Sequence, residues 1–190
     1  MAAISPMDAL SMSKAECRQT YLQANGKPYD KVVIGALIIK SDTKGNPGIL
    51  MLKRAAHETI YPNIFEIPGG KVEDSDATIL DAVKREVLEE TGMELAEVVG
   101  AVRSFDYALE KKVLDDTGSE TLVWYTSLQL NFVCQVAKHN LTVNREEHSE
   151  GQFVSRSELS ELEVTKQMRA VVEEGFAWTN EYLTGSATRV

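Results

Sequence analysis

The sequence is poor in the residues that would build a disulfide framework, a zinc site or a membrane span. It has two cysteines, Cys17 and Cys134, without metal-motif or disulfide spacing, and only three histidines. No apolar run approaches the ~20 residues that cross a bilayer, and the N-terminus lacks the charged and apolar regions of a signal peptide. We therefore expect a cytoplasmic protein in a reducing compartment, with no membrane association.

Positive charge is also scarce. Lysine and arginine total 20 against 29 acidic residues, which gives a formal net charge of −9. Because a nucleic-acid-binding surface needs a basic stripe, this balance argues against a DNA-binding protein. An anionic small molecule would instead have to be attracted by local cations, including a bound metal ion. The length of 190 residues, with 43% hydrophobic content, predicts one domain with a proper core.

Acidic residues gather at one place, where Glu86, Glu89 and Glu90 follow the Pro68-Gly69-Gly70 loop by a helix length. On a helix, spacings of i, i+3 and i+4 put the carboxylates on one face, where like charges repel by ~0.2–0.5 kcal/mol per pair. Most acidic helix faces simply contact water, but the adjacent glycine loop favours a bound cation here. No histidine or cysteine lies between residues 69 and 92, so oxygen ligands suited to Mg²⁺ or Mn²⁺, with a phosphate-bearing substrate, are expected.

This stretch resembles the signature of the Nudix hydrolase family. The pattern requires a glycine, then an Arg-Glu pair, an aliphatic residue, a Glu-Glu pair and a closing glycine. The matching residues are Gly70, Arg85, Glu86, Val87, Glu89, Glu90, Gly92 and Met93. In this resemblance Gly70, Arg85 and Gly92 are structural residues of the box. Residues 61–70 also resemble the family's lead-in, and the wider similarity covers roughly residues 28–165.

The spacing departs from the family pattern at one point, because the separation of Gly70 and Arg85 is one residue longer than the signature allows. The first glutamate of the pattern, which braces the helix by pairing with the arginine, is therefore absent. Asp76 takes its place if the extra residue bulges the loop, and Asp81 is an alternative partner of Arg85 at i, i+4. We expect the metal-binding half of the signature to stay intact.

The resemblance implies roles for the acidic residues. The implied ligands of Mg²⁺ or Mn²⁺ are the Gly69 carbonyl, Glu86, Glu89 and Glu90. One carboxylate, either Glu86 or Glu147, is implied as the catalytic base that accepts a proton from water. Glu147 lies in an acidic loop, six residues before Phe153, and Glu150 is the second choice in that loop.

Several further residues are weaker candidates. Arg54 either reaches a substrate phosphate from a strand end or forms a structural ion pair, and Lys71 is a similar case beside the metal loop. Phe65 either stacks on a base or packs in the core. We expect His148 to be a surface residue without a catalytic role, and Cys134 to pack within an apolar strand.

Apolar periodicity and turn residues divide the chain into strands and helices. We predict strands at 31–40, 49–54, 95–109 and 121–136, and helices at 14–23, 77–91, 157–162 and 163–182. Residues 110–120 are predicted to form a mobile hairpin loop. This order predicts an α+β protein, an α/β/α sandwich with a mixed sheet, as the family resemblance also implies.

The same pattern divides the chain into three segments. Residues 1–27 are predicted to be an N-terminal arm that is loose up to residue 13. Residues 28–165 are the expected Nudix domain, and residues 166–190 are a C-terminal helix followed by a tail. The arm and the apolar strands are compatible with a homodimer, although nothing in the sequence requires one.

Together these features predict metal-dependent hydrolysis of a diphosphate linkage in a nucleoside diphosphate derivative, as in nucleotide-sanitising, nucleotide-sugar or dinucleotide pyrophosphatases. The alternative is a non-catalytic Nudix-fold module that binds a nucleotide or a protein, although such modules usually lose box glutamates that this chain keeps. A third reading, an isoprenoid diphosphate isomerase, shares the fold but needs a reactive cysteine in its cleft. The residues leave the physiological substrate open.

Overall fold

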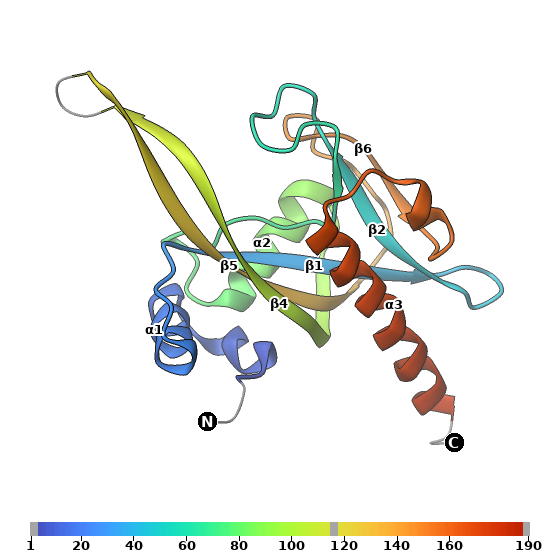
Figure 1. The fold of residues 1–190 in the computed structure, drawn as a ribbon. Helices are drawn as coiled ribbons and strands as arrows, with labels where there is room; N and C mark the ends of the chain where they lie inside the picture. Colours follow the sequence, from blue (N-terminus) through green and yellow to red (C-terminus); the bar gives the residue numbers. More distant parts are fainter. Residues whose placement is uncertain (1–3, 115–117, 188–190) are drawn as a thin grey trace.

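A computed structural model describes residues 4–114 and 118–187, which form a mixed β-sheet with helices on both faces (Figure 1). The strands are β1 (Lys31–Ser41), β2 (Pro47–Arg54), β3 (Phe65–Glu66), β4 (Leu95–Leu114), β5 (Glu120–Val136) and β6 (His148–Val154). The helices are α1 (Lys14–Asn25), α2 (Ile79–Thr91) and α3 (Lys166–Ala187), with short 3-10 helices η1 (Pro6–Ser11) and η2 (Glu158–Glu161). The predicted α+β sandwich with a mixed sheet is confirmed.

The sheet runs in the order β3-β2-β1-β5-β4, and β6 pairs with β2. β1 and β5 are parallel from the Lys31–Ser127 pair to the Ile38–Cys134 pair, whereas the other paired strands are antiparallel. The nearly continuous apolar run of β1 suits its central place, because a strand covered on both faces needs apolar side chains on both. Cys134 of β5 is fully buried, as predicted.

Two hydrophobic clusters hold the layers together, one on each face of the sheet. On one face, Ile34 and Phe132 pack with residues of η1, α1 and α2. On the other face, Leu37 and Met51 pack with residues of α3, including Phe176. A fully buried side chain of this size contributes ~1.5–3 kcal/mol, so these clusters supply most of the stability of the sandwich.

Helix α2 begins and ends at capping residues. The Thr78 hydroxyl accepts a hydrogen bond from the Asp81 amide (3.2 Å), which satisfies a donor in the first turn. Gly92 ends the helix with φ +66°, a conformation that glycine adopts without steric cost. The helix buries Val83 and Val87 toward the core and also buries two of its glutamates. The predicted helix is confirmed, with a start two residues later than residue 77.

The N-terminal segment packs against the sandwich, which corrects the prediction of a loose arm up to residue 13. Ala9 and Cys17 are 0% exposed and belong to the same hydrophobic cluster as α2. The Ile79 amide donates a hydrogen bond to the Met12 carbonyl (2.9 Å), which ties the segment to the start of α2. The prediction was wrong because the many small residues of this stretch show little apolar periodicity. One of them, Ala9, is nevertheless the residue of η1 that is buried in the core. Residues 1–3 lie outside the described part of the chain.

Most of the predicted hairpin loop at 110–120 is strand instead. Residues 110–114 of β4 pair in register with residues 120–124 of β5, and residues 115–117 lie outside the described part. Cross-strand pairing overrides the polar composition here, because each backbone group of one strand meets a partner on the other. We call residues 107–114 and 118–125 the hairpin arm, which projects beyond the rest of the sheet (Figure 1).

The C-terminal half differs from the prediction in one strand. β6 was not predicted, because its polar residues show no clear alternation, yet it pairs with β2. One face of α3 is buried against the sheet, namely Met168, Val171, Val172 and Phe176. The predicted tail is helical as far as Ala187, and residues 188–190 lie outside the described part. None of the helices in that part is long and apolar enough to cross a bilayer.

Because Ala9 is fully buried, we predict that a charged side chain at this position lowers the free energy of unfolding. In Ala9→Asp, an unpaired carboxylate would enter the core, so we expect a loss of about 3 kcal/mol in the free energy of unfolding, measured by urea denaturation. The matched control is Ser11→Asp, which places the same group at an exposed position of η1 and should change stability by less than ~0.5 kcal/mol. Equal unfolding midpoints for the two variants would show that the N-terminal segment does not pack as described.

Candidate active site

A cavity of about 350 Å³ opens beside β1, β3 and the base of the hairpin arm. The Gly69-Gly70 loop forms part of its wall, and Phe65 and Tyr107 contribute aromatic surface. Its volume lies within the range of roughly 300–1,000 Å³ that is typical of small-molecule sites. The cavity therefore offers room for a compact ligand next to the predicted metal loop.

Hydrogen bonds to β1 fix the glycine loop. The Ile34 amide donates to the Gly70 carbonyl (2.9 Å), and the Ala36 amide donates to the Pro68 carbonyl (2.7 Å). Between these two anchors, the Gly69 carbonyl accepts no hydrogen bond from any described residue. An unpaired carbonyl oxygen held on a rigid loop is a suitable ligand for a hard cation.

Two carboxylates of α2 meet this loop from the helix side. Glu90 Oε2 accepts a hydrogen bond from the Gly69 amide (2.8 Å), and the residue is only 3% exposed. Glu86 is 7% exposed and lies so close to Gly70 that a Cβ on residue 70 would stand 2.5 Å from Glu86 Oε1. A side chain at residue 70 would therefore displace the Glu86 carboxylate from its place at the loop. The structure thus brings Glu86 and Glu90 together at successive residues of one loop.

The two buried carboxylates carry more negative charge than their surroundings neutralise. Burial raises the pKa of Glu86, and the hydrogen bonds from Arg85 offset this only in part. Burial likewise raises the pKa of Glu90 well above its usual value, with further contributions from the charges of Glu66, Glu86 and Glu147. A divalent cation would supply the missing positive charge, and an all-oxygen donor set suits Mg²⁺ or Mn²⁺.

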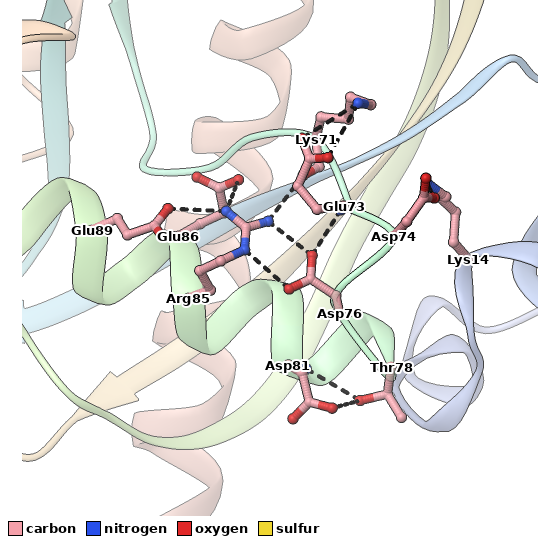
Figure 2. Close-up of polar contacts among 10 residues, drawn as sticks. All are labelled: Lys14, Lys71, Glu73, Asp74, Asp76, Thr78, Asp81, Arg85, Glu86 and Glu89. Atoms are coloured by element: carbon pink, nitrogen blue, oxygen red, sulfur yellow. Dashed lines mark hydrogen bonds and ion pairs between the residues drawn. The ribbon is translucent and has the colours of Figure 1, made fainter.

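Arg85 connects the helix to the loop, as Figure 2 shows. Its Nε and Nη2 atoms donate to the two carboxylate oxygens of Asp76 (3.0 and 2.9 Å), and Nη2 also donates to the Lys71 carbonyl (3.0 Å). Its Nη1 donates to Glu86 (2.8 Å) and to Glu89 (3.0 Å). The pKa of Arg85 is raised, first by the bond to Asp76, so this cation stays charged and in place.

The extra residue in the loop is accommodated as one of the two predicted alternatives requires. Asp76 replaces the missing glutamate as the partner of Arg85, and it also accepts a hydrogen bond from the Glu73 amide (2.8 Å). Asp81 does not pair with Arg85 but instead contacts the Thr78 hydroxyl (2.8 Å) and lies 3.6 Å from Lys84 Nζ. The bulged loop therefore keeps the bracing role of the missing residue.

The third glutamate of the predicted set points elsewhere. Glu89 is exposed and bonded to Arg85, whereas Glu86 and Glu90 are buried at the loop. Among the described residues, no group of three histidine, cysteine or acidic side chains is arranged to hold a metal ion. The donor chemistry fits a divalent ion at Glu86, Glu90 and the Gly69 carbonyl, and Glu89 would join only by exchanging its bond with Arg85.

The acidic loop before β6 contributes one carboxylate to this region. Glu147 acts electrostatically on both Glu86 and Glu90, and its Oε1 accepts a hydrogen bond from Asn144 (3.3 Å). Glu150, the second choice in that loop, instead forms an ion pair with Lys53 (3.1 Å). The structure therefore favours Glu147 over Glu150 as the additional carboxylate near Glu86 and Glu90.

His148 is buried, which corrects the prediction of a surface residue. It is 1% exposed, and neither ring nitrogen has a hydrogen-bond partner among the described residues. Its Nε2 lies 3.5 Å from Glu66 Oε1. The reason is the unpredicted pairing of β6 with β2, which sets His148 opposite Arg54.

All three weaker substrate-binding candidates line the cavity, and two of them also have structural contacts. Arg54 forms ion pairs with Glu66 (2.6 Å) and Glu58 (2.7 Å), which is the structural alternative, although it also lines the cavity. Lys71 is exposed at the cavity wall. Phe65 is 6% exposed, packs in the core and presents one side to the cavity.

Sequence reasoning missed several residues of the cavity wall, including Lys31, Tyr107 and Lys111. The alternation of Phe105, Tyr107, Leu109 and Lys111 along β4 is a signal for one common face, but the predicted loop at 110–120 concealed its last member. Glu66 also lines the cavity and was not predicted, because β3, the strand that carries it, has only two residues and gives no periodic signal.

Neither cysteine lies at the cavity. Burial raises the pKa of Cys17 to about 11 and also raises the pKa of Cys134. Both thiols are therefore protonated and enclosed at neutral pH, which removes the reactive cysteine that the isomerase reading needs.

Comparisons with known proteins agree with this architecture. A family model described as NUDIX domain matches residues 31–175. The chain is 34% identical over 73 residues to the uncharacterized Nudix hydrolase NudL of Enterobacter sp. (strain 638), which covers 37% of this chain and 38% of that protein. It is 34% identical over 95 residues to the m7GpppN-mRNA hydrolase NUDT17 of Danio rerio, which covers 50% of this chain and 29% of that protein. The chain thus spans about a third of the length of these relatives.

Solved structures share the fold. The MutT protein from Methanosarcina mazei Go1 superimposes with a TM-score of 0.54 at 26% identity, over 82% of this chain and 97% of that one. The NUDIX domain of Shewanella oneidensis NrtR, solved in complex with ADP ribose, superimposes with a TM-score of 0.52 at 14% identity, over 86% of this chain and 97% of that one. The second likeness shows the fold alone.

The pairing of Asp76 with Arg85 predicts a pH-dependent contribution to stability. Asp76→Asn should lower the free energy of unfolding by about 2 kcal/mol at pH 7, because charge-assisted hydrogen bonds are lost. Since hydrogen bonding to Arg85 lowers the folded-state pKa of Asp76, the contribution is complete above the unfolded pKa of about 3.9 and disappears as the pH falls through the folded pKa. Urea denaturation of both proteins between pH 7 and pH 3 measures this difference. Asp8→Asn, at an exposed position of η1, is the control, and a constant difference over this range would contradict the pairing of Asp76 with Arg85.

The excess charge at the loop predicts that the metal-free protein gains stability when Glu90 is neutralised. In chelator at pH 7.5, Glu90→Gln should raise the free energy of unfolding by about 1 kcal/mol, because a buried charge is removed while the carbonyl oxygen still accepts the Gly69 amide. The control is Glu94→Gln at an exposed position beyond the helix. A decrease in stability for Glu90→Gln would show that its charge is already neutralised.

Proposed function

The chain belongs to the Nudix family, and from this premise we propose that it hydrolyses a diphosphate linkage in a nucleoside diphosphate derivative with the help of Mg²⁺ or Mn²⁺. The observation that carries the proposal is the placement of Glu86 and Glu90 against one glycine loop that also lines a ligand-sized cavity. An acidic centre and a substrate space thus share residues 69 and 70, where the diphosphate would lie.

The cation would be held by Glu86, Glu90 and the Gly69 carbonyl, and Glu89 would join them by exchanging its bond with Arg85. Diphosphate bonds are inert because their anionic oxygens repel a nucleophile, and a bound divalent ion offsets that charge and lowers the pKa of water. The protein supplies the position of the ligands. The glycine loop and the buried helix face fix two of the carboxylates before any substrate binds, so little reorganisation is needed during the reaction.

Proton transfer falls to a carboxylate of the same group. Glu86 and Glu147 are the two candidates for the base, because Glu86 lies at the glycine loop and the charge of Glu147 acts on both Glu86 and Glu90. Burial raises the pKa of Glu86, which favours proton acceptance at neutral pH. Arg85 orients this carboxylate through a 2.8 Å hydrogen bond and is itself fixed by Asp76, so it acts as a positioning residue.

The remaining cavity would hold the nucleoside. Phe65 and Tyr107 line it and offer apolar and aromatic surface to a base, and Gln129 adds a buried amide at its floor. These residues select the substrate, whereas the acidic loop carries the reaction. Candidate substrates include nucleoside triphosphates, ADP-ribose, dinucleotides and capped RNA ends. The Danio rerio relative is named as an m7GpppN-mRNA hydrolase, and the Shewanella oneidensis domain was solved with ADP ribose.

A binding module without catalysis is the alternative, and one observation favours it. Glu89 is engaged by Arg85, and the described residues present no ready group of three metal-binding side chains. Chromatographic detection of hydrolysis products from a substrate panel, with Mg²⁺ and with chelator, separates the two. A catalyst releases product only with the metal, whereas a binding module shows affinity without turnover.

The proposed centre predicts a selective loss of activity. Glu90→Gln should reduce turnover of the best substrate by about a hundredfold or more with Mg²⁺ present, because a ligand of the cation is lost. Turnover is followed by chromatography of the products, and folding is checked by circular dichroism. Glu94→Gln serves as the matched control and should retain full activity. If Glu90→Gln hydrolyses the substrate at the unmodified rate, Glu90 does not belong to the catalytic centre.

A further inference from the structure

Three lysines line one wall of the cavity. Lys31 begins β1, Lys71 follows the glycine loop, and Lys111 lies in the hairpin arm, so they come from three separate segments. An isolated bridge between Val33 and Lys71 places the loop beside β1, next to the strand that carries Lys31. In a chain with a net charge of −9, three ammonium groups around one cavity form a local exception.

The position of Lys111 depends on the hairpin arm. Alternate residues of β4 face the cavity, namely Phe105, Tyr107, Leu109 and Lys111. Lys112, the next residue, pairs with Glu120 on β5 (2.6 Å) and does not line the cavity. The strand that extends into the arm (Figure 1) therefore directs one lysine to the cavity and its neighbour away from it.

The positive charges are poorly balanced by the protein itself. Among the described residues, no carboxylate oxygen lies within 4.0 Å of the Lys31 or Lys111 ammonium group. Lys71 has only a 3.3 Å contact with Glu73, where both side chains are about half exposed. Asp30, which acts on Lys31 at longer range, is hydrogen-bonded to Thr126.

The lysines also repel one another. Burial lowers the pKa of Lys31, and the charges of Lys111 and Lys71 lower it further. The Lys31 ammonium lies 5.0 Å from the centre of the Tyr125 ring, a cation–π contact that holds the side chain at the wall. A cluster of three cations with one exposed acidic partner, Glu73, is suited to an anion from outside the protein.

We propose that Lys31, Lys71 and Lys111 form a subsite for a second anionic group of the substrate, beyond the diphosphate that is hydrolysed. The proposal rests on the proposed function, because the subsite shares its cavity with the acidic centre. The group is a phosphate, present either as a monoester on the leaving moiety or as part of a longer phosphate chain. The glycine loop with its acids serves the scissile linkage, and the lysines serve the extra charge.

The direct test measures binding without turnover. Isothermal titration calorimetry in chelator compares two pairs of probes, NADPH with NADH for the monoester and diadenosine tetraphosphate with diadenosine diphosphate for the longer chain. The unmodified protein should bind the more highly charged member of at least one pair about tenfold more tightly, as expected for two or more charge contacts. The pair that shows the difference identifies the source of the phosphate.

Substitution assigns the preference to the lysines. The double variant Lys31→Gln/Lys111→Gln should lose the tenfold preference and leave the affinity for the less charged probe within twofold. The matched control, Lys112→Gln, removes the adjacent charge from the arm and should retain the preference. A control that loses the preference as fully as the double variant would show a general charge effect and overturn the subsite.

Other outcomes also decide the matter. Equal affinities within both pairs, or no measurable binding of either highly charged probe, would overturn the subsite. Turnover with Mg²⁺ is recorded separately: hydrolysis without any charge preference would leave the proposed function standing and remove the subsite. A charge preference in binding with no hydrolysis of any probe would support the subsite and count against the proposed function.

Discussion

The site depends on two carboxylates that are buried against a glycine loop without enough positive charge to balance them. Glu90 bonds to the Gly69 amide, and Glu86 fills the space that a side chain at Gly70 would occupy. An unbalanced buried charge costs several kcal/mol in a folded protein. Either a retained proton, which the raised pKa of Glu90 favours, or a cation from solution would offset this cost, and the remaining features of the site hold these two groups in place.

Arg85 and the cavity show how the rest of the molecule is organised around that charge. Arg85 bridges Asp76 and Glu86, so the loop keeps its attachment to α2 despite the additional residue. Glu86 and Glu90 contact the glycine loop that forms part of the cavity wall. Three lysines, including Lys111, line the same cavity. Opposite charges at two places in one space suit a ligand that is anionic along its length and meets a cation at each.

The sequence predicted the parts of the fold that local patterns determine. Apolar periodicity predicted α2 to within two residues of its start, because helical periodicity is a local property of the sequence. Asp76 was one of two alternatives, since only the folded loop selects between it and Asp81. The burial of His148 and the position of Lys111 depend on pairing between strands distant in sequence, where long-range contacts override composition. The sequence alone therefore did not predict the burial of His148 or the place of Lys111 at the cavity.

The central claim is that Glu86, Glu90 and the Gly69 carbonyl surround a divalent cation. The most direct measurement is an anomalous difference map from crystals of the active protein grown with Mn²⁺. The account predicts a peak bounded by these three groups that disappears in crystals of Glu90→Gln. A map of the active protein with no peak there, while both side chains keep their places against the loop, would contradict it.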